Sequence, residues 1–244
     1  MKIIFQIIIT GGLLLGFVTC ENSSANLKPY YFPIEELKSG KIYEYQSAGN
    51  KHDPPFYWHY QTREENGLIF LNGTYFDHDF NVFQKIEEEM VSNGMLLQAF
   101  SWYEPDSTGA QVEVSVDIES GNVFSFERKE PASVLLSSFS WQPLLDPSMT
   151  ISFVRNRQLE KDTTFNFQNK ELDCLKFYVR ELIDQDKEGH LEQEYEAMEI
   201  YARDIGLVYF KKDISPDWKM AYKLTNIYDL ASFEKKYNVD LDVQ

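Results

Sequence analysis

The sequence predicts a mainly β protein, with a curved antiparallel sheet (a half-barrel or a β-sandwich meander) followed by a short C-terminal helix. The first observation is hydrophobic alternation with a period of two, clearest at 110–118, where valine and isoleucine alternate with polar residues. The second is a set of dipeptides such as Asn66-Gly67 and Asn93-Gly94, which supply the positive φ angles of tight hairpins. Short strands joined by local turns form an antiparallel meander.

The predicted strands are short runs of alternating, aromatic or β-branched residues. Two further segments, Asn72-Gly73 and Ser120-Gly121-Asn122, are interpreted as hairpin turns. The runs lie at 41–46, 55–62, 68–71, 95–103, 110–118, 123–128, 151–154, 164–168, 172–182, 205–210 and 220–224.

Three segments need a choice between helix and strand. Residues 82–91 and 192–202 contain helix-forming residues, but the neighbouring turns favour strands. Residues 229–237 place apolar side chains at helical spacing behind Asp229, which predicts a closing helix capped by Asp229.

The N-terminus has the layout of a secretory signal peptide, predicted to cover residues 1–19. Lys2 precedes an apolar run that ends just before Cys20. A membrane-spanning helix is not predicted, because it would need about 20 apolar residues with flanking anchors, and polar residues follow Cys20 at once. Residues 20–29 are then a lipidated cysteine and a polar tether, and 30–244 form a single β-rich domain.

The letters FVTC at 17–20 resemble the lipobox of bacterial lipoproteins, whose cysteine becomes the acylated first residue. Phe17 and Thr19 depart from that pattern, which has Leu at its first position and Gly or Ala before the cysteine. The resemblance implies lipidation of Cys20. Ordinary cleavage near Cys20, releasing a free secreted protein, is the alternative.

The formal net charge of −16 excludes the basic stripe that nucleic-acid binding requires. It also argues against docking on anionic lipid headgroups through the protein surface. The protein is therefore expected to bind the membrane through its N-terminal lipid. Each methylene of an acyl chain buried in the bilayer stabilises membrane binding by about 0.8 kcal/mol.

Aromatic residues share individual strand faces and are the candidates for ligand binding. Such faces either line a half-open barrel around an apolar small molecule or form an ordinary closed core. Periodicity leaves both interpretations open. The candidate set is Phe56, Trp58, Tyr60, Phe100, Trp102, Phe124 and Phe126.

No catalytic residue, metal site or cofactor is expected. Residues 77–88 carry oxygen ligands at the spacing of a calcium-binding loop, but Val82 stands where that loop needs glycine. The four histidines are scattered, and Cys174 is expected to be an inert core thiol. Adjacent carboxylates such as those at 87–89 are expected to be solvated.

Over most of its length the chain resembles envelope lipoproteins of the Bacteroidetes group. The resemblance is carried by YYFPIEELKSGKIYEY at 30–45, YARDIGLVYFKKD at 201–213 and YKLTNI at 222–227. The order of elements is also loosely similar to the lipoprotein-carrier half-barrel, an antiparallel sheet curled around an apolar cavity. These resemblances imply an anchored protein of the bacterial envelope, expected at the outer membrane.

DST at 106–108 and DTT at 162–164 fit the acceptor pattern for O-linked glycans in such bacteria, so the resemblance implies attachment at Ser107 and Thr163, which must then lie on exposed loops. The alternative is that both patterns are ordinary polar turns. The combined expectation is a non-enzymatic exported lipoprotein that binds an apolar ligand or lipid. The alternative is an interaction or scaffolding lipoprotein of an outer-membrane assembly, with an envelope protein as partner. An enzyme acting on envelope glycans through paired carboxylates is a third hypothesis, which only the acidity supports.

Overall fold

The structure is a computed structural model that describes residues 25–241 and 243. Cys20 and the predicted signal peptide lie outside the described residues. The strands are β1 (Lys41–Ser47), β2 (Phe56–Glu65), β3 (Leu68–Phe76), β4 (Val82–Val91), β5 (Gly94–Pro105), β6 (Gln111–Ser115), β7 (Asp117–Ser125), β8 (Val134–Trp141), β9 (Thr150–Phe167), β10 (Lys170–Asp186), β11 (His190–Ala202), β12 (Gly206–Ser215) and β13 (Trp218–Tyr228).

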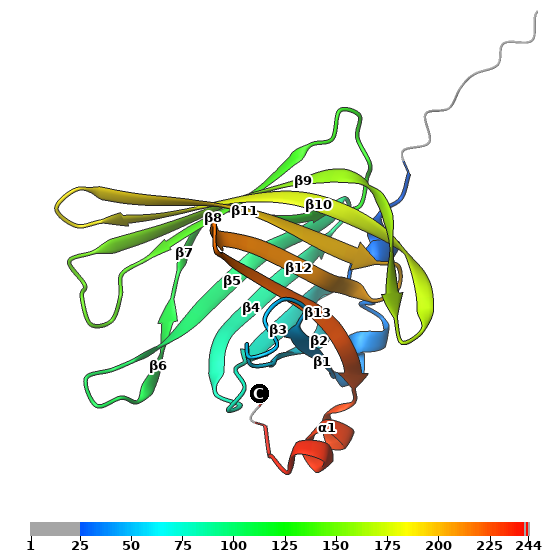
Figure 1. Ribbon diagram of the computed structural model, residues 1–244, viewed down its shortest axis with the longest axis horizontal. Helices are drawn as coiled ribbons and strands as arrows, with labels where there is room; N and C mark the ends of the chain where they lie inside the picture. The colour runs from blue at the N-terminus through cyan, green and yellow to red at the C-terminus, as the bar shows by residue number, and fades with distance from the viewer. Residues whose placement is uncertain (1–24, 242, 244) are drawn as a thin grey trace, which may run out of the picture.

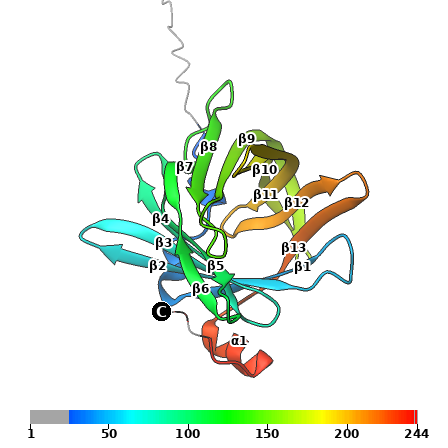
Figure 2. The same ribbon diagram turned by 90° about the vertical axis from the view of Figure 1, so that its left-hand side faces the viewer.

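These strands form one antiparallel sheet that closes on itself (Figures 1 and 2). Apart from β6 and β7, which both pair with β5, each strand pairs with the next, and β13 returns to pair with β1. Because β6 only extends the line of β7, twelve strands make up the closed ring. The predicted antiparallel meander is confirmed, but the half-barrel is corrected to a closed barrel. Closure pairs the two edge strands that an open sheet would leave exposed.

Residues 26–40, the end segment, pack against one end of the barrel, at the right of Figure 1. This segment contains two 3-10 helices, η1 (Lys28–Tyr30) and η2 (Glu36–Ser39). Leu27 donates its backbone N–H to Phe126 O at 2.8 Å, and Asp204 donates to Pro29 O at 2.7 Å. The buried side chains of this end segment are Leu27, Tyr31, Phe32, Ile34 and Leu37.

The end segment changes the expected boundary between tether and folded body. Leu27 is only 4% exposed, and Asn26 forms a bridge with Glu127. Residues 26–29 therefore belong to the packed structure, and the expected start of the body at Tyr30 is a few residues late. The stretch is mostly polar, so its sequence did not indicate that Leu27 is buried.

Helix α1 (Leu230–Tyr237) covers the outside of the barrel below β1 and β2 (Figure 1). The Asp229 side chain accepts a hydrogen bond from Ser232 N at 2.8 Å, as the predicted cap requires. Phe233 is fully buried in a cluster with Ile42, Tyr57 and Phe76. The closing helix and its cap are confirmed. Among the described residues, no helix has the length and apolar character needed to cross a membrane.

Segments 82–91 and 192–202 are confirmed as strands, but two predicted turns are wrong. Gly73 lies inside β3, and Gly121 lies inside β7. A Cβ atom on Gly73 would come within 2.8 Å of Ile86 Cγ1, and one on Gly121 within 2.5 Å of Leu97 O. These glycines permit close packing within the sheet, which local sequence does not distinguish from a turn.

Candidate functional site

The barrel lumen contains a cavity of about 300 Å³ between the end segment and the strands. Side chains alone can fill the interior of an eight-stranded barrel, and the diameter of a barrel grows with the number of its strands. A barrel of twelve strands therefore leaves more space inside. The end segment fills part of that space with Tyr31 and Phe32, which also line the cavity. The remaining volume is at the lower end of the range for small-molecule sites.

Aromatic side chains make up the apolar wall of the cavity. Strands β5, β8 and β9 bring together Phe100, Phe139 and Phe153, all of which line it. The ring centroids of Phe100 and Phe139 are 4.5 Å apart, and those of Phe139 and Phe153 are 4.9 Å apart, both in stacked arrangements. Trp102 joins the group with its centroid 4.8 Å from that of Phe100. Contacts between aromatic rings stabilise the wall in addition to the stabilisation that comes from burying apolar area.

Four residues of the candidate ligand-binding set line this cavity: Trp58, Tyr60, Phe100 and Trp102. The other three lie elsewhere in the core. Phe56 packs between Tyr45 and Tyr222, with centroid distances of 5.0 and 4.9 Å. Phe124 contacts Tyr31 and Tyr201, and Phe126 is buried in the same core cluster as Leu27.

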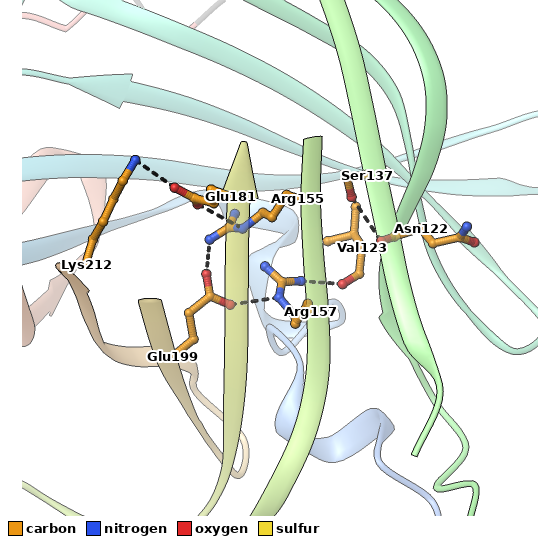
Figure 3. Close-up of polar contacts among 8 residues, drawn as sticks. All are labelled: Asn122, Val123, Ser137, Arg155, Arg157, Glu181, Glu199 and Lys212. Atoms are coloured by element: carbon orange, nitrogen blue, oxygen red, sulfur yellow. Dashed lines mark hydrogen bonds and ion pairs between the residues drawn. The ribbon is translucent and has the colours of Figure 1, made fainter. Parts of the chain in front are cut away.

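A charged cluster lies on β9 to β12 (Figure 3). Its members Arg155, Arg157 and Glu199 line the same cavity as the aromatic wall. Lys212 Nζ lies 2.7 Å from Glu181 Oε2, and Arg155 Nε lies 3.3 Å from Glu181 Oε1. Arg155 also donates from Nη2 to Glu199. Arg157 Nε lies 2.8 Å from Glu199 Oε2, although this N–H does not point at the oxygen, and Arg157 Nη1 donates to Val123 O.

The cluster is held together by opposite charges in a buried setting. Burial raises the pKa of Glu199, but the Arg155 and Arg157 guanidinium groups outweigh it and lower the pKa below 4.5. Burial acts to lower the pKa of Arg157, but Glu199, Tyr201 and Tyr31 together raise it by a larger amount, so this guanidinium stays charged. Glu199 is therefore the fixed anion between two cations.

Glu88 on β4 adds a second kind of carboxyl group to the lumen. It is 5% exposed, and the Tyr31 hydroxyl donates a hydrogen bond to its Oε2. Burial raises the pKa of Glu88 from 4.5 to about 7, although the Tyr31 hydrogen bond and the Arg157 charge act to lower it. Glu88 therefore titrates near neutral pH, whereas Glu199 stays ionised there.

Sequence reasoning missed the charged residues of the lumen. Phe153, Arg155, Arg157 and Leu159 alternate along β9, so two arginines share a face with apolar residues. That mixture on one strand face is the signal that could have identified them. The expectation that carboxylates 87–89 are solvated is wrong for Glu88, because alternation along β4 turns every second residue into the lumen.

The calcium-like spacing does not form a loop of converging ligands. Asp77 Oδ1 instead accepts backbone hydrogen bonds from Asp79 and Asn81, both at 2.9 Å, which stabilise a polar turn. Glu88 belongs to the lumen, away from that turn. In the part of the chain that the structure describes, no three His, Cys, Asp or Glu side chains converge as metal ligands would.

The remaining candidate residues lie outside the lumen. Ser107 is exposed in the turn between β5 and β6. Thr163 is half-buried inside β9 and pairs with Cys174 of β10, so the exposed-loop condition for its glycosylation fails. The DTT pattern lies within a long hairpin strand rather than at its turn. Cys174 is buried, and burial raises the pKa of its thiol to about 11.

Comparisons with known proteins bear on the fold. No protein-family model matches the sequence, and no curated protein is similar to it in sequence. The chain is similar in structure to a candidate lipoprotein from Parabacteroides distasonis, with a TM-score of 0.50, 9% identity, and coverage of 80% of this chain and 95% of that one. A candidate exported protein from Bacteroides fragilis with a YmcC-like fold has a TM-score of 0.49 and 14% identity, with coverage of 81% and 98%. At 9% identity, the first likeness shows a shared fold.

Proposed function

We propose that the protein is a non-enzymatic exported lipoprotein that binds an apolar ligand or lipid inside its barrel. The observation that carries this proposal is the cavity of about 300 Å³ with aromatic walls. Apolar walls with a few well-placed polar groups are the usual composition of small-molecule sites. Four residues of the expected binding set line the cavity, which favours a ligand site over a completely filled core.

The proposed location is the bacterial envelope, with the protein anchored to a membrane, expected to be the outer membrane, through lipid on Cys20. The apolar N-terminal run ending near Cys20 supports this proposal. The descriptions of the Parabacteroides protein as a candidate lipoprotein and of the Bacteroides protein as a candidate exported protein agree with it. The protein would then encounter ligands released from, or destined for, a membrane.

Native mass spectrometry of the full chain, extracted from the membrane of its expression host, tests anchor and ligand together. We expect a mass that begins at Cys20 with added acyl chains, and a small guest that is lost on denaturation. An acylated chain without a guest would contradict ligand binding. An unmodified chain would contradict the anchor.

A matched pair of substitutions on β8 connects the guest to the lumen. Ser137 lines the cavity, whereas its neighbour Ser138 faces the opposite side of the strand. Ser137→Phe should fill the cavity and reduce the fraction of protein that carries the guest. Ser138→Phe should leave that fraction unchanged.

The alternative scaffolding function is favoured by exposed apolar residues at one end of the barrel. Leu145 is 65% exposed in the loop between β8 and β9, and Leu191 is 55% exposed at the start of β11. An ion pair of 2.7 Å between Lys187 Nζ and Asp146 Oδ2 brings these two hairpins together. If this function holds, cross-linking should capture an envelope protein. The double substitution Leu145→Ser and Leu191→Ser should abolish that cross-link.

A further inference from the structure

The cavity lining contains one buried hydrogen-bond donor without an acceptor in the part of the chain that the structure describes. Trp102 Nε1 has no hydrogen-bond partner among the described residues. Arg155 Nε and Arg157 Nε also lack a well-directed hydrogen bond to any described residue, but they lie 3.3 Å from Glu181 Oε1 and 2.8 Å from Glu199 Oε2. Buried polar groups are nearly always paired with protein, water or ligand, so the unpaired Trp102 Nε1 indicates that an acceptor belongs in the space beside it.

The charges of the cluster favour the same kind of partner. Arg155, Arg157 and Lys212 supply three positive charges, and Glu181 and Glu199 supply two negative ones. Glu88 adds a third negative charge only when it is ionised, and its pKa of about 7 leaves much of it neutral near pH 7. With Glu88 neutral, the lumen has one uncompensated positive charge in a buried environment. A bound anion would balance that buried charge, which a neutral water molecule cannot do.

Arg155 is the member of the cluster that a guest would contact first. Its side chain is 31% exposed, compared with 7% for Arg157, and it lines the cavity with the aromatic wall of Phe139 and Phe153. A guanidinium can hold a carboxylate through two parallel hydrogen bonds. An apolar chain attached to that carboxylate would lie against the aromatic rings.

We infer that the lumen binds an amphipathic acid, with its anionic group on Arg155 and its apolar chain against the aromatic wall. This inference rests on the proposed function and adds the chemical class of the ligand. The cavity volume of about 300 Å³ suits a chain of moderate length. Decanoate and decanol are therefore suitable probes, because they have equal chains and differ only in the charged group.

Isothermal titration calorimetry of the full chain with each probe at pH 7 tests the inference. The wild-type protein should bind decanoate at least tenfold more tightly than decanol. Arg155→Gln should weaken decanoate binding about tenfold to a hundredfold, the range that a charge-assisted hydrogen bond supplies, and change decanol binding little. This variant leaves Glu181 paired with Lys212 and Glu199 paired with Arg157, so no carboxylate loses its last cation.

Arg180→Gln is the matched control, because Arg180 lies on the outer face of β10 and pairs with Glu194 at 3.0 Å. It should change the binding of neither probe. Equal affinity of the wild type for decanol and decanoate would overturn the inference while leaving the proposed function standing. Binding of neither probe would overturn both. The wild-type comparison holds even if Arg155→Gln fails to fold.

Discussion

Glu88→Gln is the perturbation whose effect follows most directly from the lumen. Glutamine keeps the shape of the side chain and an oxygen that can accept the Tyr31 hydrogen bond, but it cannot ionise. The charged and titratable groups that affect Glu88 come from the end segment and from β9, and they are Tyr31, Arg155 and Arg157. Their combined effect does not offset burial.

The sign and size of the effect follow from proton linkage. Because the pKa of Glu88 is about 7 in the folded protein and 4.5 ordinarily, the folded state binds this proton more tightly. The stabilisation by the proton is complete below the unfolded pKa and is lost as the pH rises through about 7. At about 1.4 kcal/mol for each tenfold change in proton affinity, the loss between pH 5 and pH 8 is about 2.5 kcal/mol.

The assay is urea unfolding followed by tryptophan fluorescence at several pH values from 5 to 8. Relative to wild type, Glu88→Gln should gain about 2.5 kcal/mol of unfolding free energy between pH 5 and pH 8, because it lacks the ionisation cost. Glu89→Gln, on the outer face of the same strand, is the control and should follow wild type. A difference between Glu88→Gln and wild type that stays constant with pH would refute the reasoning.

Three further predictions concern packing outside the charged cluster. Phe233→Ala should lower the unfolding free energy by about 3–5 kcal/mol in urea, because this ring is fully buried between α1 and the barrel, and a loss below about 1 kcal/mol would show that the helix contributes little. Cys174 should react with a thiol reagent only after unfolding, because it is buried and its pKa is raised to about 11; rapid labelling of the native protein would contradict this. Gly121→Ala should cost about 1–3 kcal/mol in a thermal melt, since the added Cβ would meet Leu97 O at 2.5 Å, and an unchanged melting temperature would mean that β7 moves freely.

Local pattern identified most of the strands, but it missed β8, found only the two ends of β9 and was insufficient for the closure of the sheet. The turns beside 82–91 and 192–202 favoured strands, which identified β4 and β11 despite their helix-forming residues. The pairing of Ile42 with Tyr228 joins the first and last strands across nearly the whole chain. No turn connects these two strands, so neither residue carries a local signal for the contact. The open half-barrel was the natural prediction without it.

The candidate site was predicted in part for the same reason. Aromatic alternation identifies which residues share a strand face, and it correctly grouped Trp58 with Tyr60 and Phe100 with Trp102. It does not reveal which faces meet across the lumen, so Phe56 and Phe124 were grouped with them although they lie in the filled core. The buried charges were missed because charged residues in a strand are normally taken to face water.

The most direct test of the ligand site is the position of a heavy atom in a crystal of the full chain grown with 10-bromodecanoate. Anomalous scattering locates the bromine without any assumption about where the chain binds. The account predicts one bromine inside the barrel, beside cavity residues such as Trp102 and Phe139. Bromine found only on the outer surface, or none bound at all, would contradict the assignment of the lumen as a ligand site.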